Sequence, residues 1–360
     1  MARITLEKLA HSYLSAPREP RDYALRRMDH VWEDGGAYAL LGPSGCGKTT
    51  LLNVISGLVR PSEGRVLYDG RDVTDLPPQR RNIAQVFQFP VIYDTMTVFD
   101  NLAFPLRNRR LPEAQVRTRV HEVAETLDLT ADLGRRARNL SADAKQKISL
   151  GRGLVRADVA AILFDEPLTV IDPHLKWLLR RKLKQIHERF SPTLIYVTHD
   201  QNEALTIADR VAVMNEGQVL QVGTPQELFE TPRHTFVGYF IGSPGMNLLP
   251  CRVADGAALV DGHRIALDPA RAHKAAAATG RVEIGIRPQF LQLAPAAAAG
   301  VPARMVGVED LGAFRIVTAR FGAHVVKVRV PEDQPVPADE AALVFPPQWT
   351  RLYVDGRLVE

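Results

Sequence analysis

The spacing of hydrophobic residues divides the chain into two parts of different character. Up to about Gly242, short apolar runs alternate with longer segments of helical spacing, which is typical of a mostly parallel sheet covered by helices. After Gly242, short runs of β type are separated by glycine-containing turns. We therefore predict an α/β domain over residues 1–242 and a small β-rich domain over residues 243–360.

Three apolar runs in the first part are predicted to be buried strands, namely Tyr38–Leu41, Ala161–Phe164 and Leu194–Val197. The last two end in polar residues, at the edge where a parallel sheet presents its carboxyl ends. A helix is predicted over Pro173–Arg189, between these two strands. In the second part, turns are expected at Asp261-Gly262, Gly312, Gly322 and Asp355-Gly356. The Ala- and Pro-rich stretch Ala294–Pro302 is predicted to be a surface connection rather than a strand.

Composition places the chain among water-soluble proteins of the cytosol. No segment approaches the roughly 18 uncharged apolar residues of a spanning helix, and the first ten residues lack the apolar core of a signal peptide. The 45 basic and 41 acidic residues are interspersed, so nucleic acid is not expected as a partner. Cys46 and Cys251 lie far apart, without the spacing of a zinc or redox site.

A complete phosphate-binding pattern follows the first predicted strand. Residues 42–49 match G-x-x-x-x-G-K-[ST], and an apolar face at Leu51, Leu52 and Ile55 predicts a helix directly after them. The loop's N–H groups and the helix start would hold phosphate oxygens, Lys48 would reach the β- and γ-phosphates, and Thr49 would bind Mg²⁺. The predicted nucleotide-binding residues of this segment are Gly42, Pro43, Ser44, Gly45, Cys46, Gly47, Lys48, Thr49 and Thr50.

Two further features of the phosphate site concern single side chains. Cys46 occupies a variable position of the loop, so we expect an accessory thiol that alkylating reagents modify and bound Mg-ATP shields. Asp165 and Glu166 end the second buried strand; Asp165 would hold Mg²⁺ through its water shell, and Glu166 would polarise the attacking water as a general base. An Asp-Glu pair alone also fits an ordinary surface position, but downstream of a complete loop the catalytic interpretation is favoured.

With these motifs, the sequence resembles the ABC transporter ATPase family, and most closely its maltose-type importer branch. Gln88 matches the glutamine that ties Mg²⁺ and water to a helical subdomain, here about residues 89–160. His199 matches the switch histidine at the γ-phosphate, and Asp172 matches an aspartate at the dimer seam. Tyr13 stands where the family places an aromatic residue against adenine, although Tyr23 competes for that role.

The resemblance also implies the fold and the partners. It implies a P-loop ABC cassette followed by an OB-like regulatory domain, matched at Ile284–Pro288 and Val308–Gly312. The resemblance further implies ATP and Mg²⁺ as cofactors, transmembrane permease subunits as partners and a periplasmic solute-binding protein as an indirect partner. The chain would then be peripheral, on the cytoplasmic face of the bacterial inner membrane.

The chain departs from the family at the signature segment. Where the family carries Leu-Ser-Gly-Gly-Gln, this sequence has Leu140-Ser141-Ala142-Asp143-Ala144. That segment binds the γ-phosphate of ATP held by the opposite subunit, and a carboxylate about 6 Å from a phosphate charge is worth roughly 3 kcal/mol of repulsion. Ser141 and Asp143 are also good helix-start residues, so a tolerated variant stays open. Lys145 and Lys147 would offset part of the repulsion.

An altered signature beside an intact P-loop predicts asymmetry between two ATPase chains. A second ATPase subunit with an intact signature would complete the site on this chain, which makes a heterodimer the expected assembly. The segments around Gln88 and Ser141 are similar to those of glycerol-uptake importers, so glycerol or a related polyol or sugar is the expected solute. The alternatives are a non-transport ABC ATPase, a catalytically weakened regulatory subunit and a small-molecule kinase, which would leave Gln88, Asp172 and His199 unexplained.

Overall fold

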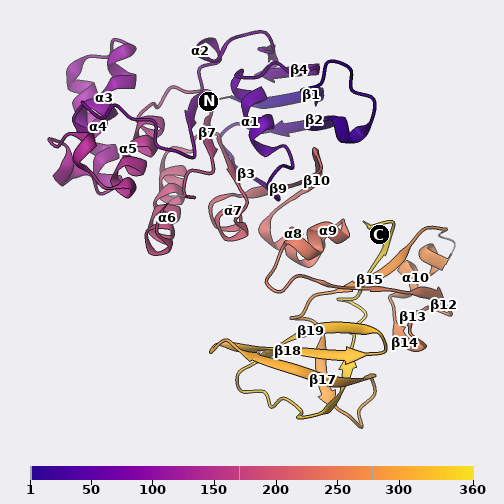
Figure 1. The fold of residues 1–360 in the computed structure, drawn as a ribbon. Coiled ribbons are helices and arrows are strands. Elements are labelled where there is room, and N and C mark those ends of the chain that lie inside the picture. The colour runs from indigo at the N-terminus through magenta and orange to yellow at the C-terminus, as the bar shows by residue number, and fades with distance from the viewer. Residues whose placement is uncertain (1, 170, 277–278) are drawn as a thin grey trace. The chain divides into compact units, whose positions relative to one another are not determined.

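The chain forms two compact units that divide at Pro225. The computed structural model describes residues 2–169, 171–276 and 279–360, and its contacts separate residues 1–225 from residues 226–360 (Figure 1). The elements of the first unit are β1 (Ile4–His11), β2 (Leu25–Trp32), β3 (Ala37–Leu41), α1 (Lys48–Ser56), β4 (Glu63–Tyr68), β5 (Arg71–Asp72), α2 (Pro78–Arg81), β6 (Ala84–Val86), α3 (Val98–Asn108), α4 (Glu113–Thr126), α5 (Ala142–Leu154), β7 (Ile162–Asp165), α6 (Pro173–Phe190), β8 (Leu194–Thr198), α7 (Gln201–Ile207), β9 (Arg210–Asn215) and β10 (Gln218–Gly223).

The first unit is built on a six-stranded sheet of order β10-β9-β3-β8-β7-β6. Strand β3 pairs in parallel with β8 and β9, and β7 pairs in parallel with β8 and β6, so only β10 runs antiparallel. The three predicted strands are therefore confirmed as β3, β7 and β8, and the predicted helix as α6. Because β3, β7 and β8 are parallel neighbours, the residues that follow them meet at one edge of the sheet.

Helix α1 lies between this sheet and a four-stranded antiparallel sheet of order β2-β1-β4-β5. Its buried Leu51, Leu52 and Ile55 share one hydrophobic cluster with apolar side chains of β1, β3 and β8. Burial of this helical face stabilises the packing by about 25 cal/mol per Å² of apolar surface removed from water. This packing holds α1 against the carboxyl end of β3. The loop between β3 and α1 is thus held at both ends.

The other hydrophobic cluster of the first unit joins helices α3, α4 and α5 to the sheet residues Phe164 and Tyr196. These helices form the magenta group that Figure 1 shows beside the sheet. Thr97 caps α3 by accepting a hydrogen bond from the Asp100 N–H, and Ser141 caps α5 by accepting from the Ala144 N–H. The predicted helix start at Ser141 is confirmed.

The second unit is mostly β-structure around its own core. Its elements are α8 (Pro225–Glu230), α9 (Thr235–Phe240), β11 (Asn247–Pro250), β12 (Arg252–Ala254), β13 (Ala257–Val260), β14 (His263–Ala266), α10 (Pro269–Ala276), β15 (Val282–Ile286), β16 (Gln292–Pro295), β17 (Val301–Asp310), β18 (Phe314–Phe321), β19 (His324–Pro331), β20 (Glu340–Val344), β21 (Arg351–Val354) and β22 (Arg357–Leu358). The sheets have the orders β11-β15-β21-β22, β12-β13-β14 and β16-β20-β17-β18-β19. The α/β fold with a β-rich second domain is therefore confirmed.

Asp-Gly pairs make the tight turns of the second unit, as predicted. Asp261-Gly262 joins β13 to β14 and Asp355-Gly356 joins β21 to β22, all four residues with positive φ. The prediction for Ala294–Pro302 is wrong in part, because Pro295 ends β16 and Pro302 lies in β17, both paired with β20. Proline is tolerated in these strands because β16 is an edge strand and Pro302 lies before β17 begins to pair with β18.

A buried arginine ties α8 and α9 to the β-structure of the second unit. Arg287 is 2% exposed, and its guanidinium donates hydrogen bonds to the backbone carbonyls of Leu228, Phe229, Gly238 and Ile241. Burial lowers the pKa of Arg287 to about 10, so the side chain keeps its charge at neutral pH. This explains why the compact unit begins before the change in sequence pattern at Gly242.

In the described part of the chain, no helix combines the length and the apolar character that crossing a membrane requires.

Replacement of Arg287 by Met is expected to destabilise the second unit by roughly 3 kcal/mol, because the carbonyls of α8 and α9 lose a charged donor while they stay buried. Urea unfolding would measure the loss, and hydrogen exchange of the α8 and α9 amides would locate it. Arg320→Met, at an exposed position on β18, is the matched control. Equal stability of the two variants would contradict a structural role for Arg287.

Candidate functional site

The loop between β3 and α1 has two positions that cannot carry a side chain. A Cβ atom at Gly42 would lie 2.3 Å from the carbonyl oxygen of Met214, and one at Gly47 would lie 2.4 Å from that of Ala24. Gly47 also has a φ of 102°, in the left-handed region that favours glycine. The loop can therefore curl tightly against β9 and the residues before β2.

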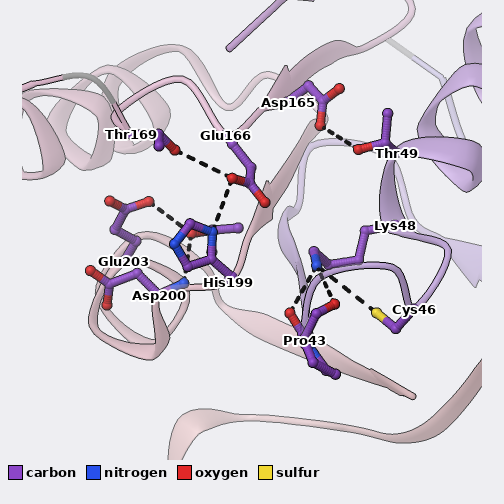
Figure 2. Close-up of polar contacts among 12 residues, drawn as sticks. Pro43, Cys46, Lys48, Thr49, Asp165, Glu166, Thr169, His199, Asp200 and Glu203 are labelled. Carbon is purple, nitrogen blue, oxygen red and sulfur yellow. Dashed lines mark hydrogen bonds and ion pairs between the residues drawn. The ribbon is translucent and has the colours of Figure 1, made fainter. Parts of the chain in front are cut away.

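Lys48 is the first residue of α1 and folds back over this loop. Its Nζ donates hydrogen bonds to the carbonyl oxygens of Gly42 at 2.8 Å and of Pro43 at 2.9 Å (Figure 2). A cation at the N-terminus of a helix makes this an anion site suited to phosphate. The carbonyl contacts hold the ammonium in place near the loop, where phosphate oxygens would replace them as partners.

Thr49 and Asp165 form the oxygen-rich side of the site. The Thr49 hydroxyl donates to Asp165 Oδ1 at 3.0 Å, which joins the start of α1 to the end of β7. Burial raises the pKa of Asp165, although the Thr49 hydrogen bond opposes this shift. A hydroxyl and a carboxylate are hard oxygen ligands that fit Mg²⁺, which proteins hold through one or two carboxylates plus phosphate oxygens. The described residues contain no group of three or more His, Cys, Asp or Glu that could hold a metal ion.

Glu166 and His199 meet at the carboxyl ends of the neighbouring strands β7 and β8. Glu166 Oε2 lies 2.9 Å from His199 Nδ1, within hydrogen-bonding distance, and the Thr169 hydroxyl donates to the same oxygen at 3.3 Å (Figure 2). Glu166 has a φ of 47°, which is uncommon for a residue with a side chain and concentrates at functional sites. Its N–H donates to the Val197 carbonyl at 2.9 Å, which holds this strained residue beside β8.

A cleft of about 510 Å³ opens over the loop and brings most of the predicted residues together. It is lined by Tyr13, Ala24, Ser44, Gly45, Gly47, Lys48, Thr49, Thr50, Gln88 and Glu166. The other predicted residues contact this lining by hydrogen bonds. Gly42 and Pro43 bond Lys48, Asp165 bonds Thr49, and His199 bonds Glu166. Sequence reasoning missed Ala24 and Thr169, because neither stands in a motif and only the folded chain brings them to the site.

Tyr13 lies at the open side of the cleft and Tyr23 does not line it. Tyr13 is 66% exposed, its hydroxyl lies 3.2 Å from Thr50 Oγ1, and its ring meets the His11 ring in a T-shaped arrangement. The Tyr23 hydroxyl instead donates to Glu63 at 3.2 Å. The geometry favours Tyr13 over Tyr23 as the aromatic residue against a bound base.

Cys46 turns away from the cleft, contrary to expectation. The side chain is 3% exposed and belongs to the hydrophobic cluster of α1 and β3. Burial raises the pKa of the thiol, and Lys48, with Nζ 3.9 Å from Sγ, offsets only part of that shift. The expectation of a readily alkylated thiol is therefore wrong, because the close approach of the loop to β9 directs the side chain inward.

Asp172 and the segment Ser141–Asp143 do not line this cleft. Asp172 caps α6 by accepting a hydrogen bond from the His174 N–H at 2.9 Å; Val170, in the same segment, lies outside the described residues. Ala142 is exposed, and Asp143 lies in the first turn of α5 without a hydrogen bond or ion pair in the described part of the chain. Lys145 pairs with Asp94 at 3.1 Å, so its charge is already engaged.

Comparison with known proteins agrees with this geometry. The family model described as ABC transporter matches residues 25–169, and the one described as MalK OB fold domain matches residues 242–291. An sn-glycerol-3-phosphate import ATP-binding protein of Bordetella avium is 39% identical over 330 residues, which cover 91% of this chain and 89% of the relative. The protein of the same name from Yersinia enterocolitica is 41% identical over 331 residues, covering 90% of each chain.

Solved structures show the same cassette. The structure of cbiO1 from Clostridium perfringens, part of the ABC transporter complex cbiONQ, has a TM-score of 0.57 at 27% identity and covers 63% of this chain and 90% of its own. The ATP-binding cassette MJ0796, in a dimeric post-hydrolysis state bound to ADP and Pi, has a TM-score of 0.54 at 26% identity and covers 61% and 98%. The predicted family and its ATP ligand are confirmed by these likenesses. The chain therefore belongs to the ABC transporter family, in which it is the ATP-binding and ATP-hydrolysing subunit of an importer.

Proposed function

We propose that the chain hydrolyses Mg-ATP at the cleft over the β3–α1 loop and thereby powers uptake of a small polyol, glycerol or its 3-phosphate. The observation that carries this proposal is the 2.9 Å contact between Glu166 and His199 at the edge of the sheet where the phosphate loop opens. A base whose orientation is fixed by a second polar side chain is what activation of a water molecule requires.

Each residue of the cleft has a distinct part in that reaction. The loop N–H groups and Lys48 bind the β- and γ-phosphates, and Tyr13 stacks on adenine. Thr49, Asp165 and Gln88 are the residues that would hold Mg²⁺, which supplies charge neutralisation on the phosphate oxygens. Glu166 accepts the proton of the attacking water, while His199 orients Glu166 and contacts the γ-phosphate.

The partners and the solute follow from the family and its named relatives. An importer ATPase works with transmembrane permease subunits, and we place this chain beneath them, peripheral to the cytoplasmic face of the bacterial inner membrane. The relatives are named for import of sn-glycerol 3-phosphate. The sequence resemblance at the signature segment adds glycerol itself as a candidate solute. Both solutes share a three-carbon polyol, which a periplasmic binding protein would deliver and the permease subunits would select.

We further propose that a second, different ATPase subunit completes the nucleotide site of this chain. The neighbour's nucleotide would face Ala142 and Asp143, and a carboxylate about 6 Å from a phosphate charge costs roughly 3 kcal/mol at an effective dielectric near 20. The Asp94–Lys145 pair, at 3.1 Å, leaves Lys145 little capacity to offset that repulsion. Because Lys48, Glu166 and His199 are all present, the weak contact would belong to the partner's site and not to this one.

Glu166→Gln is expected to retain ATP binding and to lower turnover by at least about 100-fold, because the amide keeps the shape of the side chain but cannot accept the proton. The measurement is ATP hydrolysis by the transporter reconstituted with its permease and binding protein, with nucleotide binding measured in parallel. Turnover like that of the wild type would remove Glu166 from the role of general base.

The same reconstituted transporter tests the solute. Glycerol or glycerol 3-phosphate, added with the binding protein, is expected to stimulate hydrolysis and to accumulate in the vesicles, and the more effective of the two identifies the solute. A disaccharide serves as the control. Stimulation by the disaccharide alone would overturn the assignment to polyols, and hydrolysis without any associated permease would favour an ATPase outside transport.

Tyr13→Ala is expected to weaken ATP binding about tenfold, since stacking of a base on an aromatic ring contributes roughly 1–3 kcal/mol. Tyr23→Ala is the matched control, because its hydroxyl bonds Glu63 outside the cleft. Titration of each variant with ATP and with inorganic triphosphate separates the two contributions, as only binding of the base depends on stacking. A larger loss of ATP affinity in Tyr23→Ala would reverse the assignment.

Replacement of Ala142 and Asp143 together by glycine is expected to raise hydrolysis at the partner's P-loop and to leave this chain's own site nearly unchanged. The physical reason is removal of a carboxylate and a methyl group from the surface that faces the neighbour's phosphate. Inactivating the P-loop lysine of one ATPase subunit at a time, then measuring turnover, assigns the gain to one site. A homodimer with ordinary turnover and no response to the replacement would show that these residues only begin a helix.

A further inference from the structure

A buried carboxylate with no role in the proposed chemistry is hydrogen-bonded to the residue that precedes His199. Glu203, on α7, is 3% exposed, and its Oε2 accepts hydrogen bonds from the Thr198 hydroxyl at 2.9 Å and from the Tyr196 hydroxyl at 3.0 Å. Lys176 Nζ, on α6, lies 3.8 Å from Oε1. A carboxylate is costly to bury unless it is hydrogen-bonded and paired, and here both conditions are met.

Thr198 connects this carboxylate to the backbone on both sides of His199. Its hydroxyl donates to Glu203 and accepts a hydrogen bond from the Asp200 N–H at 3.0 Å. The Asp200 side chain in turn accepts from the Asn202 N–H at 2.7 Å, which caps α7. The residues before and after His199 are therefore both fixed to the helix that carries Glu203.

The His199 side chain itself has little else to orient it. The ring is 49% exposed, and within the described residues its hydrogen bond to Glu166 is its one polar contact. Its position therefore depends on the backbone between β8 and α7, where Figure 2 shows Asp200 and Glu203 beside His199. A displacement of this backbone would lengthen the 2.9 Å contact that orients Glu166.

Glu203 also connects this turn to the helix that begins at Asp172. Lys176 lies one turn into α6, and its N–H donates to the Asp172 carbonyl at 2.9 Å. The pairing of Lys176 with Glu203 therefore links the start of α6 to the strand end that carries His199. These two segments are connected by buried charge in addition to apolar packing.

We propose that Glu203 is a positioning residue for ATP hydrolysis, which acts through the Thr198 hydroxyl to hold His199 against Glu166. This inference rests on the proposed function of Glu166 and His199. Two hydroxyl groups donate to Glu203, and only that of Thr198 belongs to a residue next to His199. The proposal therefore predicts different effects for the two hydroxyls, which a purely structural role of Glu203 does not. Tyr196 donates to the same oxygen but lies in the middle of β8, fully buried.

Thr198→Val and Tyr196→Phe form a matched pair, since each removes one hydroxyl that donates to Glu203 Oε2. In the assembled transporter, Thr198→Val is expected to lower kcat for ATP roughly five- to tenfold with KM changed less than about twofold. Tyr196→Phe is expected to keep kcat within about twofold of the wild type. Equal losses of kcat in both variants would overturn the proposal.

Combination with His199→Ala tests whether the effect passes through the imidazole. If it does, Thr198→Val in that background lowers kcat no further, whereas multiplied losses would show an independent effect and overturn the proposal. Thr198→Ser keeps the hydroxyl and is expected to restore kcat; a loss equal to that of Thr198→Val would also overturn it. An assembled wild type without ATPase activity would instead contradict the proposed function.

Discussion

The close approach of the β3–α1 loop to its neighbours is the constraint on which the nucleotide site depends. Met214 O on β9 and Ala24 O before β2 leave no space for a Cβ at Gly42 and Gly47, so the loop can curl closely against them. Since α1 is buried between two sheets, the loop is fixed at both ends. The same geometry directs Cys46 into the core and places Lys48 across the loop carbonyls.

Parallel pairing of β3, β8 and β7 then brings the chemistry to this loop. Asp165 ends β7, Glu166 follows it and His199 follows β8, so three polar side chains reach the same edge of the sheet. The left-handed backbone of Glu166 is a local cost of roughly 1–3 kcal/mol that persists only where neighbours fix it. The Val197 carbonyl, the Thr169 hydroxyl and His199 supply that fixation, which leaves the carboxylate in one orientation.

Local patterns predicted the elements of the fold and most of the site, and long-range contacts account for what they missed. Strand, glycine loop and helix follow each other directly in the sequence, so their order was readable. The sequence could not show that β16 and β17 each pair with β20, because β20 comes much later in the chain. Nor could spacing show that Cys46 faces inward or that Arg287 joins α8 and α9 to the β-structure, since each depends on segments distant in sequence.

The segment from Ser141 to Lys145 shows why sequence alone left its role open. Ser141 caps α5 and Asp143 lies in its first turn, where a negative charge stabilises a helix by roughly 0.3–1 kcal/mol. The N–H groups that make this carboxylate favourable for the helix are the ones that would otherwise attract a phosphate from the neighbouring subunit. The Asp143 carboxylate and a phosphate of the neighbouring subunit would compete for the same N–H donors. A carboxylate at this position therefore stabilises the helix start at the expense of phosphate binding. In the structure Lys145 pairs with Asp94, and Ser141 and Asp143 occupy the cap and the first turn of α5, so the observed contacts of this segment are those of a helix start.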